Sequence, residues 1–518
     1  MNGARALLRT LVASGVDVCF ANPGTSEMHF VAALDDEPGM RAVLALFEGV
    51  ATGAADGFAR MTGLPGAALL HLGPGLGNGL ANLHNARRAR VPVLAIVGDH
   101  AGYHHRYDSQ LESDIATVAR NVSTFVRTAD EVERIAEDAL DAVDAALGPP
   151  ATVATLILPA DTSWSEGAAP AAARARTAPR APSDAAVRAA RDALRSGEPA
   201  ALLLGGTSLR ARPLRAAAAS TAATGARLLG ETFPARLERG AGIAAVERVA
   251  YLAEFAEAQL GGLRNLVLVD APAPVSFFAY PGRPSDLVPQ GCTVTVLAGP
   301  GEDATAALEA LAAALGADPA TAPVAATSRP APPTGPLTGE AVAQALGALL
   351  PEGAIVSDEA NTSGLWMPAA TAGAPPHDWL TLTGGAIGQG LPVAVGAAVA
   401  APGRPVVALE ADGSAMYTLQ ALWTMAREQL DITVIIFNNR SYSILAMELN
   451  RVGAGTPGPR ARSMLDLAAP ALDFVALAGG MGVPASRATT GEELTDQLAR
   501  ALAEPGPHLI DAVVPAVF

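Results

Sequence analysis

Short runs dominated by Val, Ile and Leu recur along this chain, and longer Ala/Leu/Glu/Arg stretches of helical period separate them. In the middle of the chain the runs are "AALLLGG", "LVLVDAP" and "TVTVLAG", and towards its end they are "VVALEA", "TVIIFNN" and "HLIDAVV". Strands that are apolar on both faces need cover on both, and strands that alternate with helices form parallel sheets between helical layers. The sequence therefore predicts an α/β protein built on parallel sheets.

Two stretches rich in Ala and Pro divide the chain, one at 166–184 and the other at 317–340. They contain few large apolar residues, which is typical of linkers between folded units. A chain of 518 residues is also too long for a single core. We expect three doubly wound parallel-sheet domains, at roughly 1–165, 185–316 and 340–518.

The charged residues exclude several classes of function. The formal net charge of -16 argues against a nucleic-acid or anionic-membrane partner. All 35 basic residues are arginine, which excludes a Schiff-base lysine, a pyridoxal phosphate anchor and a phosphate-loop lysine. Any phosphate must therefore be bound by backbone amides, arginine or a metal ion.

The distribution of apolar residues and cysteines indicates a cytoplasmic protein. No run of about 20 apolar residues is free of charges and turn formers, so we expect no membrane span. The N-terminus has the pattern of an amphipathic helix followed by a strand rather than that of a signal peptide. The two cysteines, Cys19 and Cys292, lie among apolar neighbours, which predicts neither a disulfide framework nor a cysteine metal site.

Polar residues follow two neighbouring apolar runs near the end of the chain. Asp412 follows "VVALEA", and after a helical stretch Asn439 ends "TVIIFNN". A right-handed crossover places the two strands parallel and close together, so both side chains would emerge at one sheet edge. Taken singly, Asp412 would be a helix cap and Asn439 part of a turn. Together their oxygens suit Mg²⁺, which leaves positions free for water and phosphate.

The stretch "ADGSAMYTLQALWTMAREQLDITVIIFNNRSYS" closely resembles the metal- and diphosphate-binding motif of thiamine-diphosphate-dependent decarboxylases and acetohydroxyacid synthases. The resemblance implies that Asp412, Asn439 and the carbonyl of Ser441 bind Mg²⁺. It also places Gly413 and Ser414 at the diphosphate of the cofactor.

Further motifs extend the resemblance over nearly the whole chain. "FANPGTSEMHF", "ALFEGVATGAADGFAR" and "LLHLGPGLGNGLANLHNA" resemble the family's pyrimidine-binding domain, and "SDEANTSGLW" and "TLTGGAIGQGLPVAVGAA" resemble the front of its diphosphate-binding domain. The middle block matches weakly, as a central connecting domain would. The chain departs from the family at Ala411, where glycine is usual and where a methyl group would crowd the diphosphate.

The resemblance also assigns residues to the cofactor rings. Glu48, which in isolation would be an ordinary acid at a helix start, matches the glutamate that contacts the pyrimidine ring and activates the cofactor. Ile387 matches the apolar side chain beneath the rings, and the carbonyl of Gly385 would accept from the aminopyrimidine. Asn361 and Thr362 match positions near the diphosphate and thiazolium. In the family the two ends of the cofactor lie on different subunits, so a homodimer or homotetramer is implied.

Among family members, the motifs resemble those of benzoylformate decarboxylases most. Thr25 stands where those enzymes have a serine at the substrate carboxylate, and His71 stands at their proton-shuttling histidine. Phe277 replaces their second active-site histidine. His104 and His105 lie, with His100, in a loop where some pyruvate decarboxylases carry a histidine pair; a surface cluster or a metal cluster would give the same pattern. Apolar pocket residues suited to an aryl or aliphatic group follow from the same comparison: Phe277, Ile444 and Leu445.

We therefore expect non-oxidative decarboxylation of a small-molecule 2-oxo acid, with acyloin carboligation. The main alternative is the catalytic subunit of acetolactate synthase, although Glu448 stands where that family has a tryptophan, and FAD binding is left open. A second alternative is a non-catalytic relative. A nicotinamide dehydrogenase would explain the Gly-rich turns, but neither turn is followed by a convincing ribose-binding acid.

Overall fold

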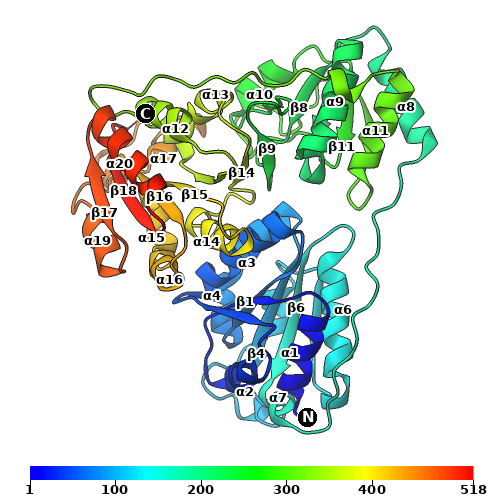
Figure 1. Cartoon of the computed structure of the whole chain (residues 1–518), viewed down its shortest axis with the longest axis vertical. Helices are drawn as coiled ribbons and strands as arrows, with labels where there is room; N and C mark the ends of the chain where they lie inside the picture. Colours follow the sequence, from blue (N-terminus) through cyan, green and yellow to red (C-terminus); the bar gives the residue numbers. More distant parts are fainter. Residues whose placement is uncertain (517–518) are drawn as a thin grey trace.

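The computed structural model describes residues 1–516 and contains three sheets, each with helices packed on both faces (Figure 1). This confirms the predicted α/β class with three parallel-dominated sheets. In Figure 1 the first sheet lies at the bottom, the second at the upper right and the third at the upper left. Among the described residues, no helix is both long enough and apolar enough to cross a membrane.

The first sheet has six parallel strands in the order β2-β1-β3-β4-β6-β5. Its strands are β1 (Val18–Ala21), β2 (Arg41–Leu44), β3 (Gly66–Leu70), β4 (Val93–Asp99), β5 (Phe125–Thr128) and β6 (Val153–Pro159). One face packs against α1 (Gly3–Ala13), α2 (Met28–Ala33) and α6 (Ile135–Leu147), and the other against α3 (Glu48–Thr62), α4 (Leu72–Ala89) and α5 (Ile115–Ala119). A short α7 (Ala160–Trp164) follows β6. Every residue of β3, β4 and β6 is buried, as expected for central strands of a covered parallel sheet.

The second sheet has five parallel strands in the order β10-β8-β7-β11-β12. Its strands are β7 (Ala200–Leu204), β8 (Arg227–Gly230), β10 (Glu247–Arg248), β11 (Asn265–Val269) and β12 (Thr293–Ala298). One face packs against α8 (Asp184–Leu194), α9 (Ala211–Thr224) and α11 (Ala304–Leu315), and the other against α10 (Ala253–Leu260).

The third sheet has seven strands in the order β17-β18-β16-β15-β13-β14-β9. Its strands are β9 (Leu237–Arg239), β13 (Ile355–Glu359), β14 (His377–Thr381), β15 (Val406–Ala411), β16 (Ile432–Asn438), β17 (Ala485–Ala488) and β18 (His508–Val513). The helices on one face are α14 (Gly390–Ala400), α15 (Asp412–Thr418), α16 (Ala421–Glu428) and α19 (Phe474–Gly480); those on the other are α12 (Gly339–Leu349), α13 (Met367–Ala370) and α20 (Gly491–Ala503). Two further helices, α17 (Ser443–Arg451) and α18 (Pro459–Ser463), follow β16.

The strand β9 departs from the all-parallel expectation. It pairs antiparallel with β14 in the third sheet, although its residues lie in the segment expected to form the central domain. Leu237 of β9 is buried opposite Trp379, so the pairing contributes to the core. A three-residue strand has too little pattern to be assigned to a sheet from sequence. The domain borders 1–165, 185–316 and 340–518 stay a prediction.

A continuous core joins the first and third sheets through α3 and α14, which lie against each other in Figure 1. Glycines permit this close approach. A Cβ at Gly57 would lie 2.2 Å from the Val393 carbonyl oxygen, and one at Gly396 would lie 1.9 Å from the Ala54 carbonyl oxygen. The helix crossing therefore fixes the first sheet relative to the loop that precedes α14.

Candidate active site

The edge of the third sheet brings together the expected metal ligands. The parallel strands β15 and β16 end side by side. Asp412 accepts hydrogen bonds from the backbone N–H groups of Gly413 at 2.8 Å and Arg440 at 2.6 Å. The side-chain oxygen of Asn439 accepts from the backbone N–H of Ser441 at 2.9 Å. The crossover geometry predicted from the spacing is therefore present.

The chemistry of these groups fits a small hard cation. Asp412 is 2% exposed, and burial raises the pKa of its carboxyl to about 6 against the opposing effect of backbone hydrogen bonds. A cation at this edge would stabilise the buried charge. Arg440 has a φ of 57°, a backbone strain that turns its N–H back towards Asp412. The expected ligand set is one carboxylate with amide and carbonyl oxygens. Within residues 1–516 no group of three or more His, Cys, Asp and Glu side chains is placed to hold a metal ion.

The residues expected near the diphosphate surround the same edge. Asn361 has a φ of 49° and donates from Nδ2 to the Ser414 hydroxyl at 3.0 Å, while Thr362 beside it is buried. A Cβ at Gly413 would lie 2.3 Å from the ring of Tyr442, so only glycine fits beneath that ring. Ala411 has φ −75° and ψ 146°, an ordinary conformation for alanine, so the departure from glycine causes no backbone strain.

The loop 383–390, which precedes α14, carries the two residues expected beneath the cofactor rings. Gly385 has a φ of 78°, and Ile387 is half-buried. A Cβ at Gly385 would lie 2.5 Å from the Phe277 ring, which places this expected pocket residue directly against the loop. Phe277 belongs to an aromatic cluster with Phe233, Tyr251 and Phe278, with ring centroids 4.8 to 6.0 Å apart.

The pocket residues Ile444 and Leu445 lie in α17, with Ile444 half-buried and Leu445 46% exposed. Arg451 at the end of α17 connects this helix to the segment that carries Phe277. Its guanidinium donates to Glu254 at 2.6 Å and to the Tyr280 hydroxyl at 3.0 Å. The two parts of the expected pocket are therefore joined by buried and half-buried polar contacts.

The first sheet holds a second group of expected residues. Glu48 is the first residue of α3, is 7% exposed, and accepts a hydrogen bond from Asn78 at 3.0 Å. A Cβ at Gly75 would lie 3.0 Å from Glu48 Oε1 and 3.4 Å from His71 Cβ. Glu48 and His71 therefore border the same glycine at the start of α4.

The buried carboxylate of Glu27 forms a hydrogen bond with the His71 ring. Glu27 is fully buried and accepts hydrogen bonds from the backbone N–H of Gly24 at 2.6 Å and from His71 Nδ1 at 2.9 Å. Burial raises the pKa of Glu27, and Gly24 and His71 oppose this effect. Thr25 is exposed in the same turn. With Nδ1 occupied by Glu27, the Nε2 atom of His71 is the ring nitrogen available for another contact.

The histidine loop has a different environment. His105 Nδ1 lies 2.9 Å from Glu112 and its Nε2 lies 3.7 Å from Asp99, whereas His104 packs near the rings of His100 and Tyr107. No hydrogen bond or ion pair joins His104 or His105 to Glu48 or His71 in the part of the chain that the structure describes. An active-site role for these two histidines stays a prediction.

Glu48 and the edge formed by Asp412 and Asn439 belong to different sheets of this chain. Across residues 1–516 no hydrogen bond or ion pair connects Glu48 with Asp412 or Asn439. The loop 383–390 instead contacts α4, where Asn82 donates to the Gly388 carbonyl at 3.2 Å and Asn85 to the Ala386 carbonyl at 2.8 Å.

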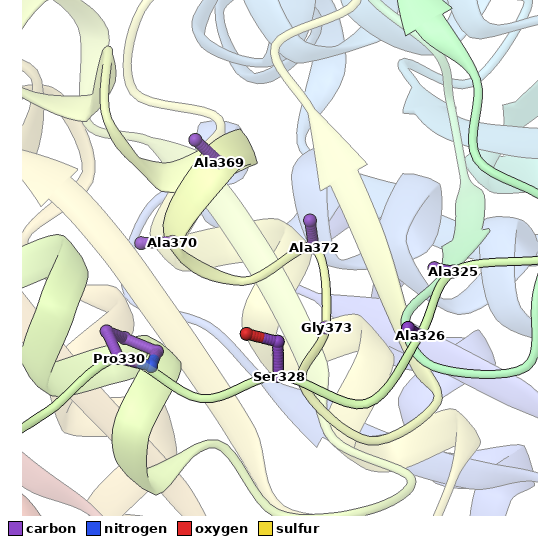
Figure 2. A pocket seen from close by; sticks show the side chains of 8 residues that line it. All are labelled: Ala325, Ala326, Ser328, Pro330, Ala369, Ala370, Ala372 and Gly373. Carbon is purple, nitrogen blue, oxygen red and sulfur yellow. The ribbon is translucent and has the colours of Figure 1, made fainter.

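A cavity of about 310 Å³ lies elsewhere, between residues 325–330 and the segment 369–373 at the end of α13 (Figure 2). It is lined by Ala325, Ala326, Ser328, Pro330, Ala369, Ala370, Ala372 and Gly373, none of which belongs to the candidate site.

Sequence reasoning missed three residues of the site. Glu27 lies two positions after Thr25, and Asn78 lies in the Gly-rich start of α4, so both were inside quoted motifs. Glu359 ends β13 and contacts the loop 383–390. Their roles depend on partners distant in sequence, and no local pattern indicates them.

Two protein-family models match parts of this chain. Residues 1–118 match the model "Thiamine pyrophosphate enzyme, N-terminal TPP binding domain", and residues 360–512 match "Thiamine pyrophosphate enzyme, C-terminal TPP binding domain". The chain is 29% identical to a benzoylformate decarboxylase of Pseudomonas aeruginosa, over 96% of both chains. A solved thiamine diphosphate-dependent 4-hydroxybenzoylformate decarboxylase of Rhodococcus jostii RHA1 has the same fold, with a TM-score of 0.87 at 23% identity over 99% of both chains.

A further relative matches over the full length of both chains. It is the Mycobacterium tuberculosis protein named "Putative acetolactate synthase large subunit IlvX", and its 518 aligned residues are 63% identical to this chain. The chain therefore belongs to the thiamine pyrophosphate enzyme family, among its decarboxylases and acetolactate synthases.

Proposed function

We propose that this protein is a thiamine-diphosphate- and Mg²⁺-dependent enzyme that decarboxylates a 2-oxo acid without oxidation, releasing an aldehyde or joining the product to a second carbonyl compound. The observation that carries this proposal is His71, held by the buried Glu27 carboxylate beside Glu48. An imidazole oriented by a buried carboxylate is suited to proton transfer.

The residues of the chain divide the work by position. Asp412, Asn439 and the Ser441 carbonyl would hold Mg²⁺, with Gly413 and Ser414 at the diphosphate. Bound thiamine diphosphate supplies the electron sink for loss of CO₂. Glu48 would hold a proton at the pyrimidine end.

The remaining expected residues would act on the substrate. His71 would hold or deliver a proton there, with Thr25 close to the substrate carboxylate. The aromatic cluster around Phe277, together with Ile444 and Leu445, would enclose an apolar substituent and exclude water from it.

We also propose that the enzyme works as a homodimer or a dimer of dimers. No hydrogen bond or ion pair joins Glu48 to Asp412 within residues 1–516, which is compatible with a site completed by a second subunit. This is the same arrangement that the family resemblance implies.

A second candidate is acetolactate synthesis, which the name of the 63% identical mycobacterial relative favours. The residue at the position that selects the acceptor substrate in synthases argues against acetolactate synthesis. Glu448, which stands where synthases have tryptophan, has no aromatic ring to stack on a second substrate, and it accepts a hydrogen bond from Arg451 at 2.5 Å.

The test is titration of the purified protein with thiamine diphosphate and Mg²⁺, followed by tryptophan fluorescence, together with CO₂ release from benzoylformate, pyruvate and branched 2-oxo acids. Decarboxylation predicts saturable binding and CO₂ with an equal amount of aldehyde. Acetolactate synthesis predicts that pyruvate is consumed without free aldehyde. Asp412→Asn is the control that should abolish saturation, and a wild-type protein without saturable binding or CO₂ release would exclude both candidates.

A further inference from the structure

Two buried carboxyl groups lie between the metal edge and the loop 383–390. Glu359, the last residue of β13, is in register with Glu410 of β15, and they are 2% and 0% exposed. Neither Glu410 oxygen accepts a hydrogen bond from the described residues. Two touching carboxylates cannot both be ionised in a dry interior. Burial raises the pKa of both carboxyl groups, and the neighbouring Glu359 raises that of Glu410 further.

The Glu359 carboxylate accepts hydrogen bonds from three consecutive backbone N–H groups. Oε1 accepts from Gly388 N–H at 2.7 Å, and Oε2 accepts from Gln389 at 2.8 Å and Gly390 at 2.5 Å. Hydrogen bonds from several N–H groups to one carboxylate are strong and set a backbone segment in one conformation. They fix the end of the loop that carries Gly385 and Ile387.

Gly390 shows how closely the loop approaches this pair. A Cβ at this position would lie 2.2 Å from Glu410 Oε2 and 2.9 Å from Glu359 Cβ. The Thr418 hydroxyl also fixes the loop, because it donates a hydrogen bond to the Gly388 carbonyl at 3.0 Å. The pair therefore connects the end of β15, two residues before Asp412, to the loop expected beneath the cofactor rings.

We propose that Glu359 is a positioning residue that sets the loop 383–390, and with it the Gly385 carbonyl and the Ile387 side chain, for the rings of thiamine diphosphate. This inference rests on the proposed function. Glu359 does not touch the cofactor in this scheme; it acts through the three amides.

The first experiment needs no cofactor. Amide hydrogen exchange of the full-length protein is followed by mass spectrometry in wild type, Glu359→Gln and Asp358→Asn. Asp358 precedes Glu359 and binds the Trp379 indole at 2.9 Å and not the loop, so it is the matched control. We expect amides 388–390 to exchange about 10-fold faster or more in Glu359→Gln, while Asp358→Asn exchanges like wild type. Unchanged exchange in Glu359→Gln would overturn the inference.

The second experiment measures function in the same proteins. We expect Glu359→Gln to raise the Kd for thiamine diphosphate about 10-fold and to lower kcat, with KM for the 2-oxo acid unchanged. If Glu359 had a purely structural role, Glu359→Gln would lower the melting temperature without the combination of a raised Kd, a lowered kcat and an unchanged KM. If Glu359→Gln does not fold, Glu359→Asp, which withdraws the carboxylate by one methylene, replaces it in both experiments.

The outcomes separate the two proposals. A wild-type protein that does not bind thiamine diphosphate refutes the proposed function and this inference with it. Normal wild-type binding with an unchanged Glu359→Gln refutes the inference alone.

Discussion

Glu27 has one carboxylate oxygen that accepts two hydrogen bonds and one that accepts none from the described residues, although the side chain is fully buried. A Cβ at Gly98 would lie 1.6 Å from the second oxygen, so the backbone closes over it. Such a group is costly to bury. Its hydrogen bond to His71 fixes the orientation of the imidazole.

Replacing Glu27 should therefore impair turnover through His71. We expect Glu27→Gln to lower kcat about 10-fold or more and to change its pH profile, because the amide no longer selects one imidazole tautomer. The affinity for thiamine diphosphate should not change. Steady-state kinetics across pH is the measurement. In a His71→Ala background the same substitution should have almost no further effect, and fully additive losses would contradict the pairing.

His377 supplies a pH dependence of stability. It is 3% exposed, its Nδ1 donates to the Pro375 carbonyl at 2.7 Å, and its Nε2 has no partner among the described residues. Burial lowers the pKa of His377 from 6.5 to about 4. The unfolded chain therefore binds a proton below pH 6.5 that the folded chain refuses, so stability is full above that pH and is lost as the pH falls towards 4.

We expect this one group to remove about 2 kcal/mol of stability between about pH 7.5 and pH 5. Thermal melting of wild type and His377→Asn, which keeps a donor for Pro375, measures the difference. The variant should show a smaller fall in Tm over this range. An equal fall in both proteins would show that His377 does not titrate as its burial requires.

At the scale of elements, a buried ion pair ties α3 to the loop 383–390. Arg60 and Asp56 are fully buried and share two hydrogen bonds at 2.8 Å. Arg60 also donates to the Thr381 carbonyl at 2.7 Å and the Thr383 hydroxyl at 2.9 Å, while Gln389 donates to Asp56 at 2.7 Å. The helix that begins with Glu48 is thus bound to the loop that carries Gly385.

Replacing only one partner of this ion pair should destabilise the protein much more than replacing both partners with apolar residues. We expect Arg60→Met to destabilise the protein by about 3–5 kcal/mol, because it leaves the Asp56 charge buried without a partner. The double variant Asp56→Leu/Arg60→Met should recover much of that loss. Arg41→Met is the control: it removes an ion pair to Glu428 whose arginine is 44% exposed, and should cost about 1 kcal/mol or less. An Arg60→Met protein with the melting temperature of wild type would show that Asp56 does not need Arg60 as a partner in the folded protein.

At the scale of the whole molecule, the two halves of the site lie on different sheets. Figure 1 shows α3 against α14, and Asn82 and Asn85 of α4 donate to carbonyl groups of the loop before α14. In the proposed dimer, the first sheet of a second chain would lie at the Asp412 edge, so that Glu48 and Asp412 from different chains would form one site.

Complementation between inactive variants tests this arrangement. Glu48→Gln and Asp412→Asn should each be inactive alone. Co-expressed in equal amounts, they should form mixed dimers with one intact site, and the population should regain about a quarter of wild-type activity. Sites contained within single chains would give no activity in the mixture. Size-exclusion chromatography of all samples provides the control for assembly.

The sequence by itself determined the parallel sheets, because buried apolar strands and intervening helices leave a periodic pattern in local composition. It also determined the edge formed by Asp412 and Asn439, since a short crossover leaves little choice of where the second strand ends. The tertiary structure alone decided that Glu27 supports His71, that Glu359 binds the loop 383–390 and that β9 joins the third sheet. Each of these depends on groups from distant segments meeting in a dry interior, where a carboxylate indistinguishable in sequence from a surface acid acquires its partner and its role.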